Sequence, residues 1–477
     1  MLFTSLPFVL IFLPVALLGT FLCRRSGGPR RAILFLTVTS FAFYSWHQPA
    51  HVLLLLASLL TNYALGQRLW LRRERLVLSL GIAFNLGLLA WFKYAGFLVD
   101  NVEAIFGLSA ELGSIILPLG ISFFTFQQIA YLVDVHQRKA EPHGLLDYAF
   151  FVTFFPQLIA GPIVHHSALV PQLSGLAFAR FLASDMLAGV LLFSLGLAKK
   201  VLIADQLRFG GDRLFEAVEL GIEPSLAEAW FGMLCYTFQI YFDFSGYSDM
   251  ALGLGRMFGL RLPVNFNSPY KAASIIDFWR RWNITLSHFL RDYLYVPLGG
   301  NRRGPLLRYA NLWSVMLVGG LWHGAGWTFV VWGGLHGLYL AINHAWRYYG
   351  FALPRPAAVA ATFAAVVVAW VFFRAGSFEN AFVVLGAMLG AGSPAIFDTA
   401  LLEGVHEGVL PISLLLALAA LLSWALPNSA EVVARLEGGE ASHRGADQLA
   451  VTCGTLAALA LFYVYSAGSY EFIYFQF

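Results

Sequence analysis

Long, nearly unbroken apolar runs recur along this chain, such as Phe8 to Phe21 and Leu76 to Phe92. Charged residues make up only 12% of the 477 residues, which excludes an ordinary soluble protein, a disordered chain and a nucleic-acid-binding module. Side chains this apolar are stable in lipid, where the backbone must satisfy its own hydrogen bonds as helices or as a closed barrel. Barrel strands would appear as short alternating segments, so the continuous runs predict an all-α polytopic membrane protein.

The spacing of the apolar runs also predicts how often the chain meets the membrane. A spanning helix needs roughly 20 mostly apolar residues, and about 11 to 13 segments come near this length as transmembrane or re-entrant helices. Arginine-rich connectors stay in the cytoplasm. The connectors Arg24–Arg31 and Arg72–Arg75 are such segments, whereas the connector after residue 94 carries Asp100 and Glu103. This alternation predicts that both ends of the chain lie outside the cytoplasm.

His323 stands in an otherwise apolar segment and has Gly320 and Gly324 beside it. A polar residue within a membrane segment is a candidate for function, and glycines let a backbone or a substrate approach closely. An imidazole can take up and return a proton near neutral pH. The spacing leaves open a structural histidine that bonds across helices, and that interpretation fits His336 in the next glycine-rich segment better.

A second polar cluster contains Asp243, Ser245 and Asp249. Two carboxylates six positions apart could serve proton or metal chemistry. The alternative is a packed polar seam in which they pair with arginines such as Arg256 or Arg280. No histidine stands at ligand spacing, so the sequence predicts no bound metal.

Two further stretches should depart from regular membrane helices. The segment 154–163 contains two prolines and a glycine, which should interrupt a helix. From 263 to 305 the chain is aromatic and charged without a clean span, and Asp277 and Arg281 are spaced to pair on one helix. This second stretch is either an amphipathic helix on the membrane surface or a helix packed at membrane depth that lines a polar cavity.

The chain lacks the sequence motifs of several large enzyme classes. It contains no Gly-x-Ser-x-Gly elbow, no His-Glu-x-x-His, no phosphate-binding loop and no dinucleotide fingerprint. The residues alone leave a membrane enzyme that uses His323, a secondary transporter of polysaccharide or lipid-linked sugar, and a non-catalytic membrane scaffold as alternatives.

Five segments together resemble the membrane-bound O-acyltransferase (MBOAT) family, in particular its bacterial alginate O-acetyltransferase branch. They occur in the family's order: FFPQLIAGPI (154–163), DFSGYSDMALGLGRMFGLRLPVNFNSPY (243–270), DFWRRWNITLSHFLRDYLYVPLGGNRRG (277–304), LWHGAGWTFVVWGGLHG (321–337) and WVFFRAGSFENA (370–381). The resemblance implies a ring of membrane helices around a thinned core, with funnels that meet at a catalytic histidine. Residues 1–477 then form one membrane domain, with N-terminal helices in 1–112, a catalytic core in 113–381 and C-terminal helices and a tail in 382–477.

The resemblance assigns the catalytic histidine to His323 and the family's second site position to Asn283. This branch more often has histidine at the second position, so the chain departs from its nearest pattern there. Asparagine does not titrate, but it can orient a donor carbonyl or His323 by hydrogen bonding.

The last six residues, Phe472 to Phe477, resemble the aromatic endings of this branch or of its small partner peptides, in which a tyrosine is proposed to carry the acyl group. Tyr474 would be that residue, because a phenol of pKa about 10 forms a more reactive ester than a sugar hydroxyl does. The alternative is a terminal aromatic anchor at the membrane interface.

The resemblance further implies an acetyltransferase of the bacterial inner membrane, embedded in lipid and with a periplasmic C-terminus. It would use acetyl-CoA as acyl donor, bind no cofactor, and work with periplasmic acetyltransferases or other exopolysaccharide-modification proteins. D-alanyl transfer to a cell-envelope polymer is the nearest alternative. The side chains expected to bind the donor or the substrate are Trp279, Arg280, Arg281, Asp243, Ser245, Trp327 and His336.

Overall fold

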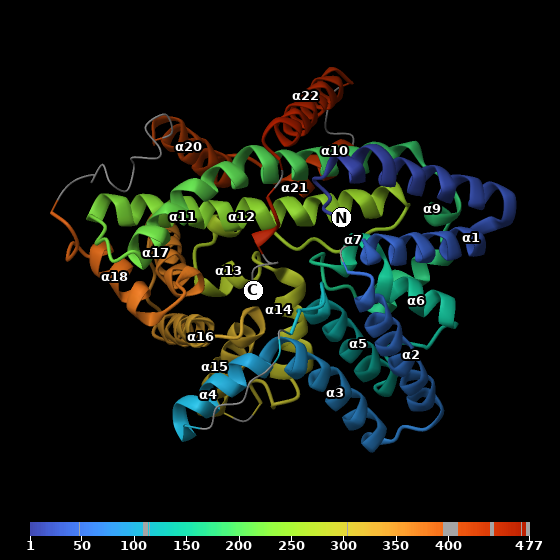
Figure 1. Ribbon diagram of the computed structural model, residues 1–477, viewed down its shortest axis with the longest axis horizontal. Coiled ribbons are helices and arrows are strands. Elements are labelled where there is room, and N and C mark those ends of the chain that lie inside the picture. Colours follow the sequence, from blue (N-terminus) through green and yellow to red (C-terminus); the bar gives the residue numbers. More distant parts are fainter. Residues whose placement is uncertain are drawn as a thin grey trace.

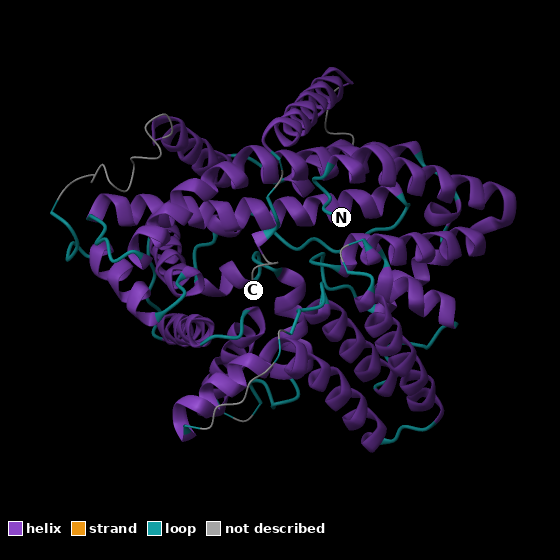
Figure 2. Ribbon diagram, viewed as in Figure 1, coloured by secondary structure: helices purple, strands orange, loops and turns teal. Residues whose placement is uncertain are grey.

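The computed structural model describes residues 1–46, 48–107, 113, 115–302, 304–394, 409–438, 443–468 and 470–473. These residues form helices joined by loops, and Figure 2 draws no strand among them. Longer helices surround a central region that holds the short helices α13 (Ile275–Trp279) and α14 (Ile284–Leu290) (Figure 1). The predicted all-α fold is therefore confirmed.

The remaining helical elements follow one another along the chain in three groups. The first group is η1 (Phe8–Phe12), α1 (Leu13–Ser45), α2 (Ala50–Leu71), α3 (Arg75–Leu89), η2 (Ala90–Tyr94) and α4 (Ala95–Phe106). The second is α5 (Ile121–His136), α6 (Leu145–Thr153), α7 (Phe155–Leu158), α8 (His166–Leu169), η3 (Val170–Ser174), α9 (Leu176–Ala179), α10 (Ala183–Ala198), η4 (Lys199–Ala204), α11 (Asp205–Glu219) and α12 (Leu226–Met257). The third is η5 (Pro269–Lys271), η6 (Arg291–Tyr295), α15 (Pro305–His323), α16 (Trp327–Tyr348), α17 (Arg355–Arg374), α18 (Phe378–Met388), α20 (Val409–Ala425), α21 (Ser429–Glu437) and α22 (His443–Ala467).

Among the described residues, six helical segments are long and apolar enough to cross a membrane, or seven if one bent pair counts as a span. The six are Phe8–Ser45, Ala50–Leu71, Arg75–Phe106, Ala183–Glu219, Arg355–Arg374 and Asp447–Ala467. The protein is thus a multi-pass membrane protein. The other segments in the predicted set are shorter, broken or more polar. The segment 154–163, for example, interrupts the helix as predicted, because α6 ends at Thr153 and α7 covers only four residues.

The predicted connector Arg24–Arg31 lies inside α1 and divides it. Gly28 has φ +75° and ψ −173°, and Pro29 follows directly. Glycine adopts this backbone conformation without a side-chain clash, and proline cannot donate the helical hydrogen bond. The two halves of α1 therefore separate at the position where the sequence predicts a connector between two apolar runs.

Helices α10 and α12 approach each other closely because glycines face each other along their contact. A Cβ atom on Gly196 would lie 2.5 Å from the carbonyl oxygen of Gly246, and one on Gly189 would lie 2.7 Å from that of Gly253. Small residues allow membrane helices to pack backbone against backbone. This contact fixes how η4, which continues α10, is aligned along α12.

The stretch 263–305 folds as two short α-helices, α13 and α14, together with the turns η5 and η6, rather than as one helix. Phe278, Trp282 and Leu286 are buried, which supports the prediction of a segment packed into the protein over that of a surface helix. Asp277 and Arg281 form the predicted pair, with 2.9 Å between Oδ1 and Nε.

The next acidic residue of this stretch, Asp292, lies in η6 and pairs with its neighbour Arg291. The hydrogen bonds from Arg291 hold the pKa of the Asp292 carboxyl below its ordinary value, because they favour the charged form. This pair therefore stays ionised at neutral pH.

Helices α15 and α16 pack through Gly320 and Gly333, which lie against each other's helix backbone. A Cβ atom on Gly333 would collide with the carbonyl oxygen of Met316, which cannot rotate away. We expect Gly333→Ala to lower the free energy of unfolding by about 1–3 kcal/mol, the usual cost of overpacking a tight contact. Thermal unfolding in detergent should detect this loss, and Gly454→Ala is the matched control because no atom lies within 4 Å of its added Cβ. Equal stability of the two variants would contradict the prediction.

Candidate active site

His323 is the last residue of α15 and lies in a cage of aromatic rings. The ring centroids of Trp322 and Trp332 are both 5.0 Å from that of His323, and the ring centroid of Phe373 is 5.3 Å away. All three rings meet the imidazole edge-on or nearly so. The side chain is 3% exposed, so the cage holds the imidazole in one place within the protein.

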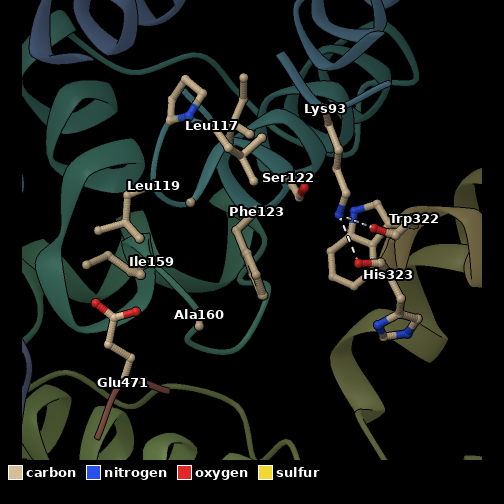
Figure 3. Close-up of a pocket in the computed structure, with 13 residues that line it drawn as sticks. Lys93, Leu117, Leu119, Ser122, Phe123, Ile159, Ala160, Trp322, His323 and Glu471 are labelled. Atoms are coloured by element: carbon tan, nitrogen blue, oxygen red, sulfur yellow. Dashed lines mark hydrogen bonds between the residues drawn. The ribbon is translucent and has the colours of Figure 1, made fainter. Parts of the chain in front are cut away.

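A cavity of about 140 Å³ reaches His323. Its walls come from η2, from the loop before α5 and its first turn, from the loop after α7, from the end of α15 and from the chain after α22. Figure 3 shows Lys93 and His323 on one side of this cavity and Glu471 on the other. The broken segment 154–163 contributes Ile159 and Ala160, as expected for a helix that is interrupted at membrane depth. His323 is therefore accessible from a cavity despite its burial.

Two neighbouring residues bind the last carbonyl groups of α15. Lys93 Nζ donates to the carbonyl oxygens of Trp322 (2.6 Å) and His323 (3.1 Å), and Tyr94 Oη donates to that of Leu321 (2.9 Å). The final carbonyls of a helix have no partner within the helix, and a cation is favourable at this end. Lys93 and Tyr94 therefore hold the turn of backbone that carries His323.

The chain after α22 returns to the centre of the protein and ends, in its described part, beside this cavity. Glu471 lines the cavity, and the backbone N–H of Ile473 donates to Asp243 Oδ2 at 3.0 Å. Phe472 and Ile473 are buried. Tyr474, predicted as an acyl carrier, lies outside the described residues.

Asn283 is buried just before α14 in a left-handed backbone conformation, with φ +41° and ψ +55°. Its Nδ2 atom has no hydrogen-bond partner among the described residues. A chain of tryptophans leads from this position to the candidate catalytic residue: Trp282 contacts Trp370 (5.1 Å), Trp370 stacks on Trp332 (5.6 Å), and Trp332 contacts His323. One aromatic core thus runs from Trp282, the residue before Asn283, to His323, while Asn283 is not among the residues that line the cavity.

Known proteins resemble this chain over most of its length. A peptidoglycan O-acetyltransferase of Helicobacter pylori is 43% identical over 424 residues, which cover 82% of this chain and 80% of the relative. A probable alginate O-acetylase AlgI of Pseudomonas aeruginosa is 42% identical over 431 residues, covering 87% and 80%. The model of the membrane-bound O-acyltransferase family matches residues 136–374.

The chain belongs to the membrane-bound O-acyltransferase family. It is an O-acyltransferase. Of the three alternatives that the residues alone left open, the membrane enzyme is therefore correct, and the transporter and the scaffold are not. A teichoic acid D-alanyltransferase of Streptococcus thermophilus is a more distant relative, 27% identical over 248 residues that cover 48% of this chain and 57% of the relative.

The family match contains His323 and Asn283, but Lys93, Tyr94 and Glu471 lie outside its range. The sequence analysis did not single out these three residues. Lys93 is the one charged residue in the apolar run 76–98, and a charge within a membrane segment is a signal of function. The cavity of this O-acyltransferase is therefore completed by segments on both sides of the matched region.

Asp243 and Ser245 lie on α12. Asp243 pairs with Lys200 at 2.6 Å, while Arg256 pairs with Asp185 at 2.7 Å, so the predicted pairing of Asp243 with Arg256 or Arg280 is wrong. Ser245 Oγ is buried without a hydrogen-bond partner among the described residues. Asp243 contacts the C-terminal segment.

The other predicted binding residues lie at different depths. His336 is fully buried and accepts a hydrogen bond from Trp279 Nε1 at 3.3 Å. Arg280 is exposed and Arg281 is half-buried in its pair with Asp277. Trp327 is 53% exposed and donates to Asn101 Oδ1 at 2.8 Å, which places it against α4. Of the predicted site residues that the structure describes, only His323 lines the cavity.

Proposed function

We propose that this O-acyltransferase moves an acetyl group from cytoplasmic acetyl-CoA to the outer face of the bacterial inner membrane, for O-acetylation of an exopolysaccharide such as alginate. Two relatives that match more than four fifths of the chain carry names of O-acetylating enzymes. The cavity at His323 measures only about 140 Å³, which suits a two-carbon acyl group better than a long acyl chain. Acetylation of a polymer outside the cytoplasm is the function that these observations support best.

His323 acts as the general base in this proposal. It removes the proton of an acceptor hydroxyl, the hydroxyl oxygen attacks the thioester carbonyl carbon, and the carbon–sulfur bond breaks. The proton then passes from His323 to the leaving thiolate, so that free coenzyme A and an acetyl ester result. Asn283 positions the reacting groups through its unpartnered Nδ2 atom. Arg280 and Arg302 expose their guanidinium groups, which can pair with the phosphates of the donor.

The proximity of the C-terminal tail to His323 carries this proposal, with Tyr474 as the acceptor. Glu471 lines the same cavity as His323, and Tyr474 follows it by three positions. An extended chain covers three residues in about 10 Å, so we expect the Tyr474 phenol to be able to reach the imidazole. The acetyl group would cross as a tyrosine ester and be passed to a periplasmic transferase, and the large charged donor would never cross. A hydroxyl on a partner protein is the alternative acceptor.

The acetyl-tyrosine intermediate can be detected directly. We expect membranes supplied with isotope-labelled acetyl-CoA to yield a C-terminal peptide with the label on Tyr474, measured by mass spectrometry. Tyr474→Phe removes only the hydroxyl and should abolish the label on this peptide. Membranes that acetylate polymer while Tyr474 never carries label would contradict the relay.

The teichoic acid D-alanyltransferase relative makes D-alanyl transfer a second candidate function. A D-alanyl group is also small enough for the cavity at His323, so the donor must be identified by experiment. The same membranes supplied with a labelled D-alanyl thioester in place of acetyl-CoA separate the two functions. Label from the D-alanyl donor alone would favour the second candidate.

A further inference from the structure

A buried ionic cluster lies between α10–η4–α11 and α12, and the chemistry proposed for His323 does not use it. Lys200 Nζ lies 2.5 Å from Asp205 Oδ1 and 2.6 Å from Asp243 Oδ1. All three side chains are at most 5% exposed. Charged side chains at membrane depth are costly and commonly mark function. One cation and two carboxylates leave a surplus of acceptor oxygens in the cluster.

The C-terminal tail, residues 470–473, binds this cluster through its main chain. Ile473 N–H donates to Asp243 Oδ2 at 3.0 Å, and Lys200 Nζ donates to the carbonyl oxygen of Glu471 at 3.3 Å. The cluster thus contacts both a donor and an acceptor of the tail backbone. Main-chain contacts of this kind fix the position of a chain along its direction, independently of its side chains.

The side chains of the tail residues between and before these two bonds also make contacts. The Phe472 ring stacks on Tyr247 with ring centroids 4.6 Å apart, and it lies 5.4 Å from Phe244. Before it, Tyr470 lies under the Arg208 guanidinium at 4.7 Å. Figure 1 shows this red segment passing from α22 across α12 toward the middle of the protein. Residues of η4, α11 and α12 thus contact each of the four residues 470–473, which shows that this part of the tail has a defined position.

We propose that Lys200, Asp205 and Asp243 form a docking site for the chain's own C-terminal tail, which sets how far the tail extends into the His323 cavity. Asp243 and Lys200 hold the backbone at 473 and 471, and Asp205 orients Lys200. These are positioning residues, because they act on the acceptor through the tail. Binding of the tail to this site does not depend on the proposed function. The role of that binding in catalysis does, because it requires Tyr474 to be the acceptor.

Docking can be measured without any acyl transfer, by digestion of the full-length enzyme in detergent micelles with a carboxypeptidase that also releases proline. Intact mass is the readout, and each trimming rate is divided by the rate for the matching free C-terminal peptide. Loss of a hydrogen bond to a charged group is worth about 1.5–3 kcal/mol, so Asp243→Asn and Ile473→Pro should each speed trimming past residue 471 by about tenfold or more. Proline removes the N–H that binds Asp243 and leaves the helices untouched, so Ile473→Pro is decisive even if Asp243→Asn fails to fold.

Two variants serve as controls. Ile473→Ala keeps the N–H and loses the same buried side chain as Ile473→Pro, so it is the reference against which Ile473→Pro is compared. Asp249→Asn removes no contact with the docking cluster and should trim within about twofold of the parent. Asp249→Asn breaks an ion pair with Lys199, 2.6 Å long and on the same two elements, whose described contacts do not include the tail. Equal trimming of Ile473→Pro and Ile473→Ala would overturn the docking site.

The effect of tail docking on acetyl transfer is measured in a separate experiment. With the acetyl label on Tyr474, Ile473→Pro should lower kcat by about tenfold while KM for the donor stays unchanged, since only the acceptor is misplaced. Unchanged kcat in a variant with a freely trimmed tail would overturn the positioning role. If trimming responds as expected but the parent never carries label, the docking site stands and the tyrosine relay fails.

Discussion

Replacing His323 with Ala should lower polymer-bound acetate by about 10²- to 10⁴-fold, the contribution that a positioned general base makes to a reaction. The imidazole is the titratable group that the cage of Trp322, Trp332 and Phe373 presents to the cavity, so no neighbouring ring can replace it. The measurement is acetate released from purified polymer, in membranes that contain equal amounts of the variant and the parent.

Two further histidine variants separate chemistry from packing. His323→Gln keeps most of the volume and a hydrogen-bonding group, so it should lose as much activity as His323→Ala if proton transfer is the role. His336→Gln makes the same change one helix away, where the ring accepts from Trp279, and it should retain at least about tenfold more activity than His323→Gln. Full acetylation by His323→Gln at normal protein levels would rule out the assignment.

The fold class follows from the sequence because the apolar runs and their arginine-rich connectors are local features. The break in α1 was predictable from the arginine-rich connector Arg24–Arg31, and the interruption in 154–163 was predictable from its two prolines and its glycine. The π-helical turns Ala90–Tyr94 and Lys199–Ala204 were not predictable, because one extra residue in a helical turn leaves the apolar pattern of the sequence almost unchanged. Both turns carry the lysines, Lys93 and Lys200, that bind the site and the tail.

The candidate site was predicted only in part. His323 is conspicuous in the sequence because it is a polar residue among apolar ones. The pairing of Asp243 with Lys200 spans 43 positions and depends on how η4 lies along α12, which the facing glycines of α10 and α12 determine. Such a register arises from packing between distant segments, so the sequence could suggest only the wrong partners, Arg256 and Arg280.

The left-handed backbone at Asn283 is a further feature that the sequence conceals. The spacing of Asp277 and Arg281 suggested one continuous helix, and the ion pair did form. The helix nevertheless stops, and α14 begins only after Asn283, at φ +41°. Asparagine tolerates this conformation better than most residues. The turn buries its side chain amide beside Trp282, in the aromatic core that also holds His323.

Replacing Lys93 with Met should reduce acetylation by about 100-fold. The variant leaves the carbonyl oxygens of Trp322 and His323 without their donor at a buried helix end, and each buried unsatisfied group costs about 1–3 kcal/mol. The last turn of α15 is then free to shift, and a small displacement of a catalytic group is enough to cause a loss of this size. The same acetate measurement tests this expectation, with protein levels and thermal unfolding recorded in parallel.

Comparison with two conservative variants shows whether Lys93 acts by holding His323 in place. Lys93→Arg keeps a cation and hydrogen-bond donors, so it should recover most of the activity that Lys93→Met loses. Tyr94→Phe removes a single hydrogen bond, to the carbonyl oxygen of Leu321, which precedes Trp322 and His323 in the chain. This loss should reduce the stabilisation of the α15 end by about 1 kcal/mol or less. A displaced His323 slows the chemical step but does not affect binding of the donor. We therefore expect kcat to fall in Lys93→Met while KM changes little. A Lys93→Met enzyme with the parent's kcat would show that the backbone of α15 holds its catalytic end without help from η2.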